Sequence, residues 1–259
     1  MNRRVIAFDL DGTLAVTKSP LSDLMAAQIA ALLSIYEVCV ISGGNFEQFK
    51  TQLIHGLKAT PDALSKLHIM PTSGTSYFRF DPKHSEWVMQ YSENLSAGER
   101  NEIIDVLKDG ARELGFWEPS PVGDIIEDRG SQVTFSALGQ NAPADRKHAW
   151  DPDGVKKYAL RDYAAERLPN LEVHVGGTTS VDVTAAGIDK SYGMRKLMDT
   201  LGLEREDILF FGDKFDEGGN DYPVKAMGID TIAVRNWEDT AIAIQAIVAV
   251  SRISDLARR

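Results

Sequence analysis

Cysteine and long apolar segments are both scarce in this sequence. Its 259 residues include one cysteine, Cys39, so no disulfide can form within the chain. Because Cys39 lies in the apolar stretch "VCVI", we expect it to be a small, inert core residue. No apolar run approaches the roughly 20 residues of a membrane span, and the first predicted strand begins at Arg4 or Val5, which leaves no room for a secretory signal. We therefore expect a cytoplasmic protein with no membrane partner.

Basic residues are also outnumbered. The chain has 28 Lys and Arg against 38 Asp and Glu, a net charge of −10. Nucleic-acid binding needs a basic stripe that neutralises phosphates, and none is visible, so nucleic acid is excluded as a partner. If the substrate is anionic, the few cations of this chain must be gathered around it.

The first 80 residues alternate between strand and helix patterns. Strands are predicted at "RVIAFDLD", "EVCVISGG" and "LHIMPTSG", and helices at "SPLSDLMAAQIAALLS" and "NFEQFKTQLIHGL". Ser19 is predicted to cap the first helix, with Pro20 at its first position. Asn45 and Gln48 have the spacing of a capping box at the second. Such alternation is typical of a parallel sheet with crossover helices, so we predict an α/β, Rossmann-like core.

The pattern changes near residue 84 and returns near residue 185. Between them, two helical segments ("SAGERNEIIDVLKDGARELGF" and "GVKKYALRDYAAERL") are mixed with two strand pairs ("DIIEDRGSQVTFSAL" and "LEVHVGGTTSVDVTA"). Paired strands next to helices indicate an α+β domain. We therefore predict a core of residues 1–83 and 185–259 and an inserted domain of residues 84–184, with hinges at "DPK" and "TAAG".

Chemistry-bearing residues follow the predicted core strands. Ligands of open α/β sheets bind at the carboxyl ends of the strands. The first strand ends in Asp9 and Asp11, and the second runs into Ser42, Gly43 and Gly44. After the insertion, Lys190 opens a helix, and the strand "ILFFG" leads to Asp213 and then to "GGND" with Asn220 and Asp221.

This set of residues fits phosphoryl transfer through an aspartyl-phosphate. An aspartate can attack phosphorus, and a second acid two residues later can protonate the leaving oxygen and then activate water. Mg²⁺ prefers oxygen ligands, and Asp9, the backbone carbonyl of Asp11 and Asp213 would supply them. An EF-hand calcium loop is excluded, because Pro20 and Leu14 stand where that loop requires glutamate and glycine. Taken singly, Ser42 can also be a turn residue, and a lysine such as Lys190 at a helix start is disfavoured by the macrodipole unless an anion is near.

In this order, "DLDGT", "VISGG", Lys190 and "FFGDKFDEGGND" resemble the four motifs of the haloacid dehalogenase (HAD) superfamily, over essentially the whole chain. The position of the insertion resembles the C2 cap class, subfamily IIB. The segments "ILFFGDKFDEGGNDYPVKAMGI" and "VHVGGTTSVDVTAAGIDKSYGMRKL" are most similar to α-phosphomannomutases and related sugar-phosphate phosphatases. The resemblance implies that Asp9 is the nucleophile and Asp11 the general acid/base. It also implies that Ser42 and Lys190 complete the catalytic set, and that Asp9, Asp11 and Asp213 hold Mg²⁺.

The same resemblance makes the insertion a cap that selects the substrate. Arg129 in "EDRG" matches a mutase arginine that binds sugar phosphate, and Ser180 and Asp182 in "SVD" match residues that contact sugar hydroxyls. Lys147 and Lys18 stand where mutases have arginines, although each can also be an ordinary surface lysine. Gly43 follows the motif serine and is expected to contact substrate. Cap-mediated homodimers occur among such mutases, so the chain is expected to be a monomer or a homodimer of this kind.

Several differences from the mutases favour a hydrolase. Gln140 in "LGQN" replaces an arginine, two further arginines are lysines, the loop after "GGND" is shorter, and "ISGG" keeps the serine of phosphatases. A mutase must hold a second phosphate, which fewer bidentate cations would hold less firmly. We therefore predict a Mg²⁺-dependent phosphatase of a small phosphorylated sugar. A phosphomannomutase-like isomerase is the alternative, and a binding module with an inactive site is a third hypothesis.

Overall fold

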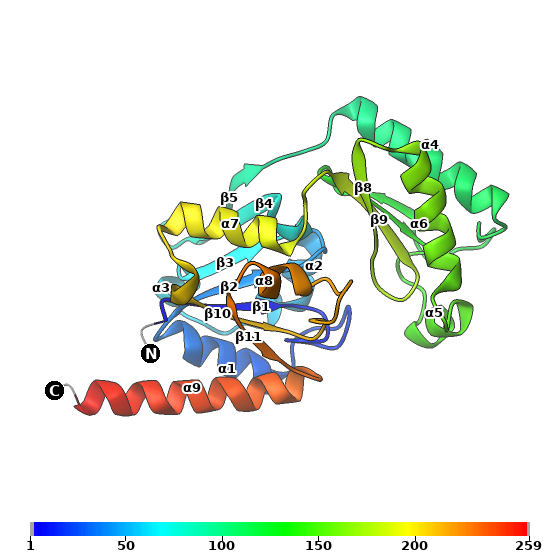
Figure 1. The fold of residues 1–259 in the computed structure, drawn as a ribbon. Coiled ribbons are helices and arrows are strands. Elements are labelled where there is room, and N and C mark those ends of the chain that lie inside the picture. The colour runs from blue at the N-terminus through cyan, green and yellow to red at the C-terminus, as the bar shows by residue number, and fades with distance from the viewer. Residues whose placement is uncertain (1–2, 258–259) are drawn as a thin grey trace. The chain divides into compact units, whose positions relative to one another are not determined.

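A computed structural model describes residues 3–257 of the chain. In it, the chain forms two compact units. The core unit comprises the described residues of Met1–Ser92 and Asp189–Arg259, and the inserted unit comprises Glu93–Ile188. The second unit thus interrupts the first in sequence (Figure 1). Within residues 3–257, no helix combines the length and the apolar character that crossing a bilayer requires.

The core unit is built on a seven-stranded sheet of order β11-β10-β1-β2-β3-β4-β5. Its strands are β1 (Val5–Asp9), β2 (Glu37–Ile41), β3 (Leu67–Met70), β4 (Ser76–Asp81), β5 (Glu86–Ser92), β10 (Ile208–Gly212) and β11 (Asp230–Ala233). Neighbours from β11 to β3 run parallel, and the β4–β5 hairpin adds two antiparallel strands at one edge. The predicted α/β class with a largely parallel sheet is confirmed.

Helices cover both faces of this sheet because β1 is apolar on both faces. Ile6 and Phe8 belong to the apolar cluster that includes residues of α1, α2 and α9, whereas Val5 and Ala7 belong to the cluster that includes residues of α7 and α8. Figure 1 shows α7 and the pair α1 and α9 on opposite sides of this sheet. The helices are α1 (Asp23–Leu33), α2 (Phe46–Gln52), α3 (Pro61–Leu64), α7 (Lys190–Leu201), α8 (Tyr222–Ala226) and α9 (Trp237–Ala257), with the 3-10 turns η1 (Ile54–Gly56), η2 (Thr72–Gly74) and η3 (Arg205–Asp207).

Helix α1 begins later than predicted. Its N-cap is Ser22, whose side chain accepts a hydrogen bond from the N–H of Met25 at 3.2 Å, so the prediction of Ser19 as the cap is wrong. The physical reason is a tertiary contact of the preceding segment. The N–H of Leu21 donates to the carbonyl of Gln52 at 2.8 Å, which holds residues 19–21 outside the helix.

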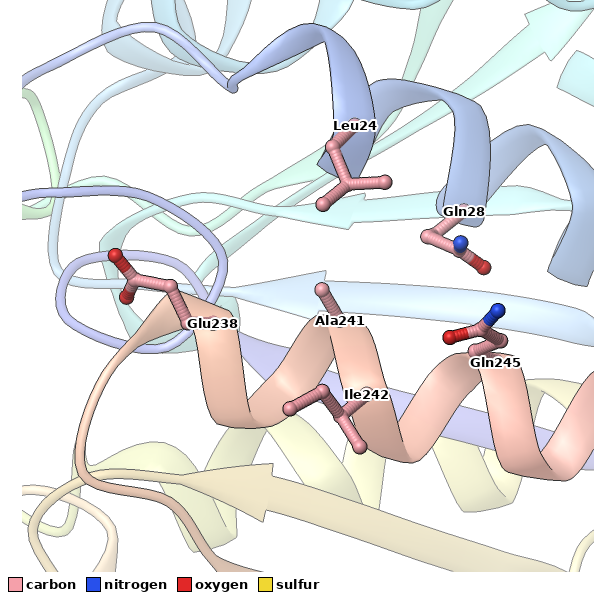
Figure 2. A pocket seen from close by; sticks show the side chains of 6 residues that line it. All are labelled: Leu24, Gln28, Glu238, Ala241, Ile242 and Gln245. Carbon is pink, nitrogen blue, oxygen red and sulfur yellow. The ribbon is translucent and has the colours of Figure 1, made fainter.

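A groove runs along the surface between α1 and α9, which pack against each other. Figure 2 shows the side chains that line it, which come from α1 (Leu24 and Gln28) and from α9 (Glu238, Ala241, Ile242 and Gln245). Leu24 and Ile242 are exposed, whereas Ala241 is buried. None of these six residues is among those predicted to carry chemistry, so the groove is separate from the candidate active site.

The inserted unit is an antiparallel sheet covered by helices. The sheet has the order β6-β7-β9-β8, with β6 (Ile126–Asp128), β7 (Gln132–Ser136), β8 (Leu171–Val175) and β9 (Ser180–Ala185). Its helices are α4 (Ala97–Glu113), α5 (Ala144–Trp150) and α6 (Val155–Arg167). Val133, Phe135, Val181 and Val183 of the sheet form one apolar cluster with α4 and α6. Both predicted hairpins and both predicted helices are present, and α5 was not predicted.

The β4–β5 hairpin moves the start of the insertion. The sequence placed the boundary at residue 84, but β5 pairs with β4 in the large sheet, from Ser76↔Ser92 to Asp81↔Glu86. The "DPK" segment is therefore the turn of a core hairpin rather than a hinge. The inserted unit begins at Glu93 and ends at Ile188, a few residues after the predicted end at 184.

Candidate active site

Three parallel strands deliver polar side chains to one edge of the core sheet. Asp9 is the last residue of β1 and pairs with Ile41 of β2, so Ser42 follows directly beside it. On the other side, Phe8 pairs with Phe211 of β10, which places Asp213 just beyond the strand end. The turn that follows β1 requires glycine at position 12, because φ of Gly12 is +89° and a Cβ there would lie 2.5 Å from Oδ2 of Asp213.

Lys190 joins two of the acidic side chains. Its Nζ lies 2.5 Å from Oδ1 of Asp9 and 2.6 Å from Oδ1 of Asp221, and all three side chains are buried. Lys190 is the first residue of α7, whose N-cap Asp189 accepts a hydrogen bond from the N–H of Tyr192. The two carboxylates supply the negative charge that a lysine at a helix N-terminus needs.

Asp221 is a structural partner rather than an open ligand. Its Oδ1 accepts from Lys190, and its Oδ2 accepts from the backbone N–H groups of Asp213 at 3.1 Å and Lys214 at 3.0 Å. Oδ2 thereby fixes the loop that carries Asp213, whereas Oδ1 is used by Lys190. Asn220 is exposed, and its side chain makes no hydrogen bond within residues 3–257, so the structure gives it no contact with this group.

The acidic group has the charge and the open oxygens of a cation site. Ligand atoms of Asp9, Asp213 and Asp221 lie within 4.8 Å of one another. Within the described residues, Oδ2 of Asp9 and Oδ1 of Asp213 are buried and accept no hydrogen bond. Three carboxylates share one buried ammonium, which leaves negative charge uncompensated. A divalent cation would satisfy both free oxygens and balance this charge.

Burial is the main cause of the shifted pKa values of the acidic side chains in this group. Burial raises the pKa of Asp9 to about 7, although Lys190 partly offsets it. Burial likewise raises the pKa of Asp213, and the nearby Lys214 lowers it only in part. For Lys190, burial alone would lower the pKa, but the charges of Asp9 and Asp221 outweigh it and raise the pKa, so the lysine stays protonated.

Two glutamines hold Asp11, and the sequence did not point to either in this role. Gln52 Nε2 donates to Oδ1 of Asp11 at 3.0 Å, and Gln48 Nε2 donates to Oδ2 at 2.9 Å. The backbone N–H of Lys18, whose φ is +57°, also donates to Oδ1 at 2.8 Å. Asp11 thus stands apart from the cluster of Asp9, Asp213 and Asp221, with its carboxylate held by three donors.

The capping-box prediction is half right. Asn45 caps α2 and accepts a hydrogen bond from the N–H of Gln48, but the Gln48 side chain turns to Asp11 and Gln52 instead of the cap. The available signal was the i, i+4 spacing of Gln48 and Gln52 on a helix that starts beside the motif serine.

Ser42 and Gly43 lie at the entrance to α2. Ser42 is buried, and its Oγ accepts a hydrogen bond from the N–H of Gly44 at 3.3 Å, as a turn residue would. Gly43 is half-buried, and a Cβ there would meet no atom within 4 Å. No side chain at Gly43 therefore stands between this backbone segment and a ligand.

The remaining predicted residues belong to the inserted unit. Arg129 Nη2 lies 2.8 Å from Oε2 of Glu127, and only 8% of the arginine side chain is exposed. Lys147 is on α5 and donates from Nζ to the carbonyl of Gln140 at 2.8 Å. Ser180 and Asp182 are half-buried residues of β9.

The sequence matches a known protein family. The model of the family described as eukaryotic phosphomannomutase matches residues 26–250. A phosphomannomutase of Encephalitozoon cuniculi is 25% identical over 256 residues, which cover 92% of this chain and 91% of that protein. A phosphomannomutase of Spinacia oleracea is 26% identical over 227 residues, 86% of each chain.

Solved structures share the fold at lower identity. The N-terminally truncated, IMP-bound IMP-nucleotidase of Plasmodium falciparum superposes with a TM-score of 0.68 at 15% identity, over 96% of this chain and 68% of that one. A haloacid dehalogenase-like hydrolase of Bacteroides thetaiotaomicron gives a TM-score of 0.63 at 17% identity, over 95% and 99% of the two chains. At such identities the likeness concerns the fold alone.

Proposed function

The chain belongs to the eukaryotic phosphomannomutase family, within the haloacid dehalogenase superfamily, and from this premise we propose that it is a Mg²⁺-dependent phosphatase of a small phosphorylated sugar. We propose further that Asp9 carries the phosphoryl group. Asp9 ends β1 beside Ser42, its Oδ1 faces Lys190, and its Oδ2 is without a hydrogen-bond partner in the described structure. One carboxylate oxygen is therefore oriented by the ammonium, and the other has no partner within the described residues.

The proposed reaction has two steps. In the first, Asp9 forms a bond to phosphorus, the bond to the leaving sugar oxygen breaks, and Asp11 gives that oxygen a proton. In the second, Asp11 takes a proton from water, the oxygen of that water attacks phosphorus, and Asp9 is released together with inorganic phosphate. Lys190 orients Asp9 and partly offsets the rise of its pKa on burial, and the Gln48 and Gln52 amides hold Asp11 in place between the two transfers.

Mg²⁺ would be held by Asp9, Asp213 and the backbone carbonyl of Asp11. When bound, such an ion offsets the charge between carboxylate and phosphate and on the phosphoryl oxygens. The buried, unpartnered oxygens of Asp9 and Asp213 support this assignment. Ser42 and the backbone at Gly43, which carries no side chain, would contact the phosphate oxygens.

The choice of hydrolysis over isomerisation is carried by the cations of the inserted unit. Gln140 stands at a position where the resemblance expects an arginine. The backbone carbonyl of Gln140 accepts a hydrogen bond from Lys147 Nζ. Arg129 is paired with Glu127 at 2.8 Å. A mutase must grip the second phosphate of a bisphosphorylated sugar, and cations already engaged within the unit grip it less firmly.

A phosphomannomutase-like isomerase is the second candidate, and the family match over residues 26–250 is the observation that favours it. The two differ in what reaches the aspartyl-phosphate first, water or a sugar hydroxyl. The test is phosphate release from a panel of sugar phosphates with Mg²⁺, with mannose 1-phosphate also followed by a coupled assay for the 6-phosphate, with and without a hexose bisphosphate. Phosphate without isomer supports the phosphatase, and isomer formed faster than phosphate supports the mutase.

The nucleophile is tested in the same assay. Asp9→Asn should abolish turnover, because an amide neither attacks phosphorus nor pairs with Lys190. Asp62→Asn, at an exposed position of α3, is the matched control and should retain full activity. Substantial turnover by Asp9→Asn would overturn the assignment of Asp9.

A further inference from the structure

The sheet of the inserted unit has one face made of polar side chains. Along β7, Val133 and Phe135 point into the apolar cluster with α4 and α6, so the alternate residues point to the opposite face. Residues directly opposite each other on paired strands share a face. The register therefore places on the polar face Glu127, Gln132, Thr134, Ser136, Glu172, His174, Ser180, Asp182 and Thr184.

A directed chain of hydrogen bonds crosses the centre of this face and ends at Asp182. Gln132 Nε2 donates to Thr134 Oγ1 at 2.9 Å, and Thr134 Oγ1 donates to Oδ1 of Asp182 at 2.7 Å. The glutamine amide is a donor here, so the threonine proton is left for the carboxylate. Gln132 and Thr134 are each 2% exposed, whereas Asp182 is half-buried. The chain thus fixes a reachable carboxylate from beneath.

The second oxygen of Asp182 is left open. Within residues 3–257, its Oδ2 accepts no hydrogen bond. The neighbouring backbone keeps this space clear, because a Cβ on Gly176 would lie 2.6 Å from that oxygen. A carboxylate with one oxygen anchored and the other free is a directional acceptor for a hydroxyl group.

The charge around Asp182 selects against a second anion. Glu127, Asp182 and Glu172 lie on this face, Arg129 is paired with Glu127 at 2.8 Å, and the exposed His174 lies 3.3 Å from Glu172. A phosphate brought next to Asp182 would meet like charge, whereas a hydroxyl would donate to it.

We propose that Thr134, itself oriented by Gln132, is a positioning residue that aims Asp182 at a hydroxyl of a neutral polyol group, the part of the substrate that is not transferred. This rests on the proposed function, which assigns the substrate as a phosphorylated sugar. Thr134 acts through Asp182, and it determines specificity because substrates that lack the hydroxyl gain nothing from the aimed carboxylate.

The chain offers a matched pair of threonines for the test. Thr184 lies on the same face and is 4% exposed, but its Oγ1 makes no hydrogen bond in the described structure. Thr134→Val and Thr184→Val therefore remove the same atom from similar surroundings, and only the first breaks the chain to Asp182. Thr134→Ser keeps the hydroxyl and serves as the rescue variant. The substrates are mannose 1-phosphate and p-nitrophenyl phosphate, which has no sugar hydroxyls.

For Thr134→Val, we expect kcat/KM on mannose 1-phosphate to fall about tenfold, mainly through KM, as for a lost hydrogen bond to a charged group. Activity on p-nitrophenyl phosphate should stay within about twofold for every variant, and Thr134→Ser and Thr184→Val should behave like the natural protein. An equal loss on both substrates, an equal effect of Thr184→Val, or no loss at all would overturn the proposal.

Failure of the proposed function gives a different result. If the natural protein releases phosphate from neither compound, the phosphatase assignment is wrong. The same variants are then compared by calorimetric binding of mannose 1-phosphate to the Mg²⁺-loaded protein. A Kd about tenfold weaker for Thr134→Val alone supports the role of Thr134, and equal Kd values for all variants, or no binding at all, overturn it.

Discussion

Replacing Lys190 by methionine tests the electrostatic balance of the candidate site. The change removes an ammonium 2.5 Å from Asp9 and 2.6 Å from Asp221 and keeps most of the buried stem. Only 2% of the Lys190 side chain is exposed, so little solvent screens the charges that remain. Removing one partner of a buried ion pair costs about 3–5 kcal/mol. At about 2–4 °C per kcal/mol for a chain of this size, Tm should fall by roughly 6–20 °C.

The assay is thermal unfolding in EDTA, with Lys196→Met as the control on the same helix. Lys196 Nζ lies over the rings of Tyr91 and Tyr192 at 5.4 and 5.6 Å, a contact worth about 0.5–1 kcal/mol. The deficit of Lys190→Met should shrink from pH 8 to pH 6, because Asp9, with its raised pKa, then takes up a proton and loses its charge. Equal Tm values for the two variants at pH 8 would refute the view that Lys190 compensates these carboxylates.

Two further predictions concern the metal and the pH dependence of stability. At about 100 times its Kd, Mg²⁺ should stabilise the natural protein by about 2.7 kcal/mol, which is a Tm rise of roughly 5–10 °C. The Asp213→Asn variant should lose most of this Tm rise. If Tm does not rise at equal ionic strength, the metal site is contradicted. His68 is buried between Glu37 and Tyr77, and burial lowers its pKa despite the Glu37 hydrogen bond. The folded state therefore resists protonation of His68, and stability should be lost as pH falls below the unfolded value of about 6.5. The raised pKa values of Asp9 and Asp213 change stability with pH in the opposite direction, so the natural protein must be compared with the His68→Gln variant. The difference in Tm between the two is measured from pH 7.5 to 5.5 and should become smaller towards low pH. A constant difference would contradict this role of His68.

The order of strand and helix patterns predicts the positions of Asp9, Ser42 and Asp213 well. Parallel strands must end at one edge of a sheet, so residues that follow strands meet there without any knowledge of side-chain geometry. The lysine at the start of α7 could also be anticipated, because its unfavourable place on the helix dipole required an anion.

Contacts between distant side chains could not be predicted in the same way. The spacing of Asn45 and Gln48 predicts a capping box from local sequence alone. In the structure the Gln48 amide leaves the cap because the charge of Asp11 attracts it. Likewise, the strand pattern of Glu86–Ser92 shows that a strand forms but not which sheet it joins. Local periodicity fixes the type of an element, and its partner depends on tertiary packing.

The pairing of β1 with β10 has a consequence for biosynthesis. β1 is an interior strand, but its partner on one side, β10, ends at Gly212, more than 200 residues after Val5, and the whole inserted unit is synthesised between them. At about 5–20 residues per second, an edge of β1 would remain unpaired for roughly 10–40 s on the ribosome. The inserted unit, which is continuous from Glu93 to Ile188, can complete its own sheet during that time. We expect the nascent chain to acquire this unit first and to need protection of the β1 edge until β10 emerges.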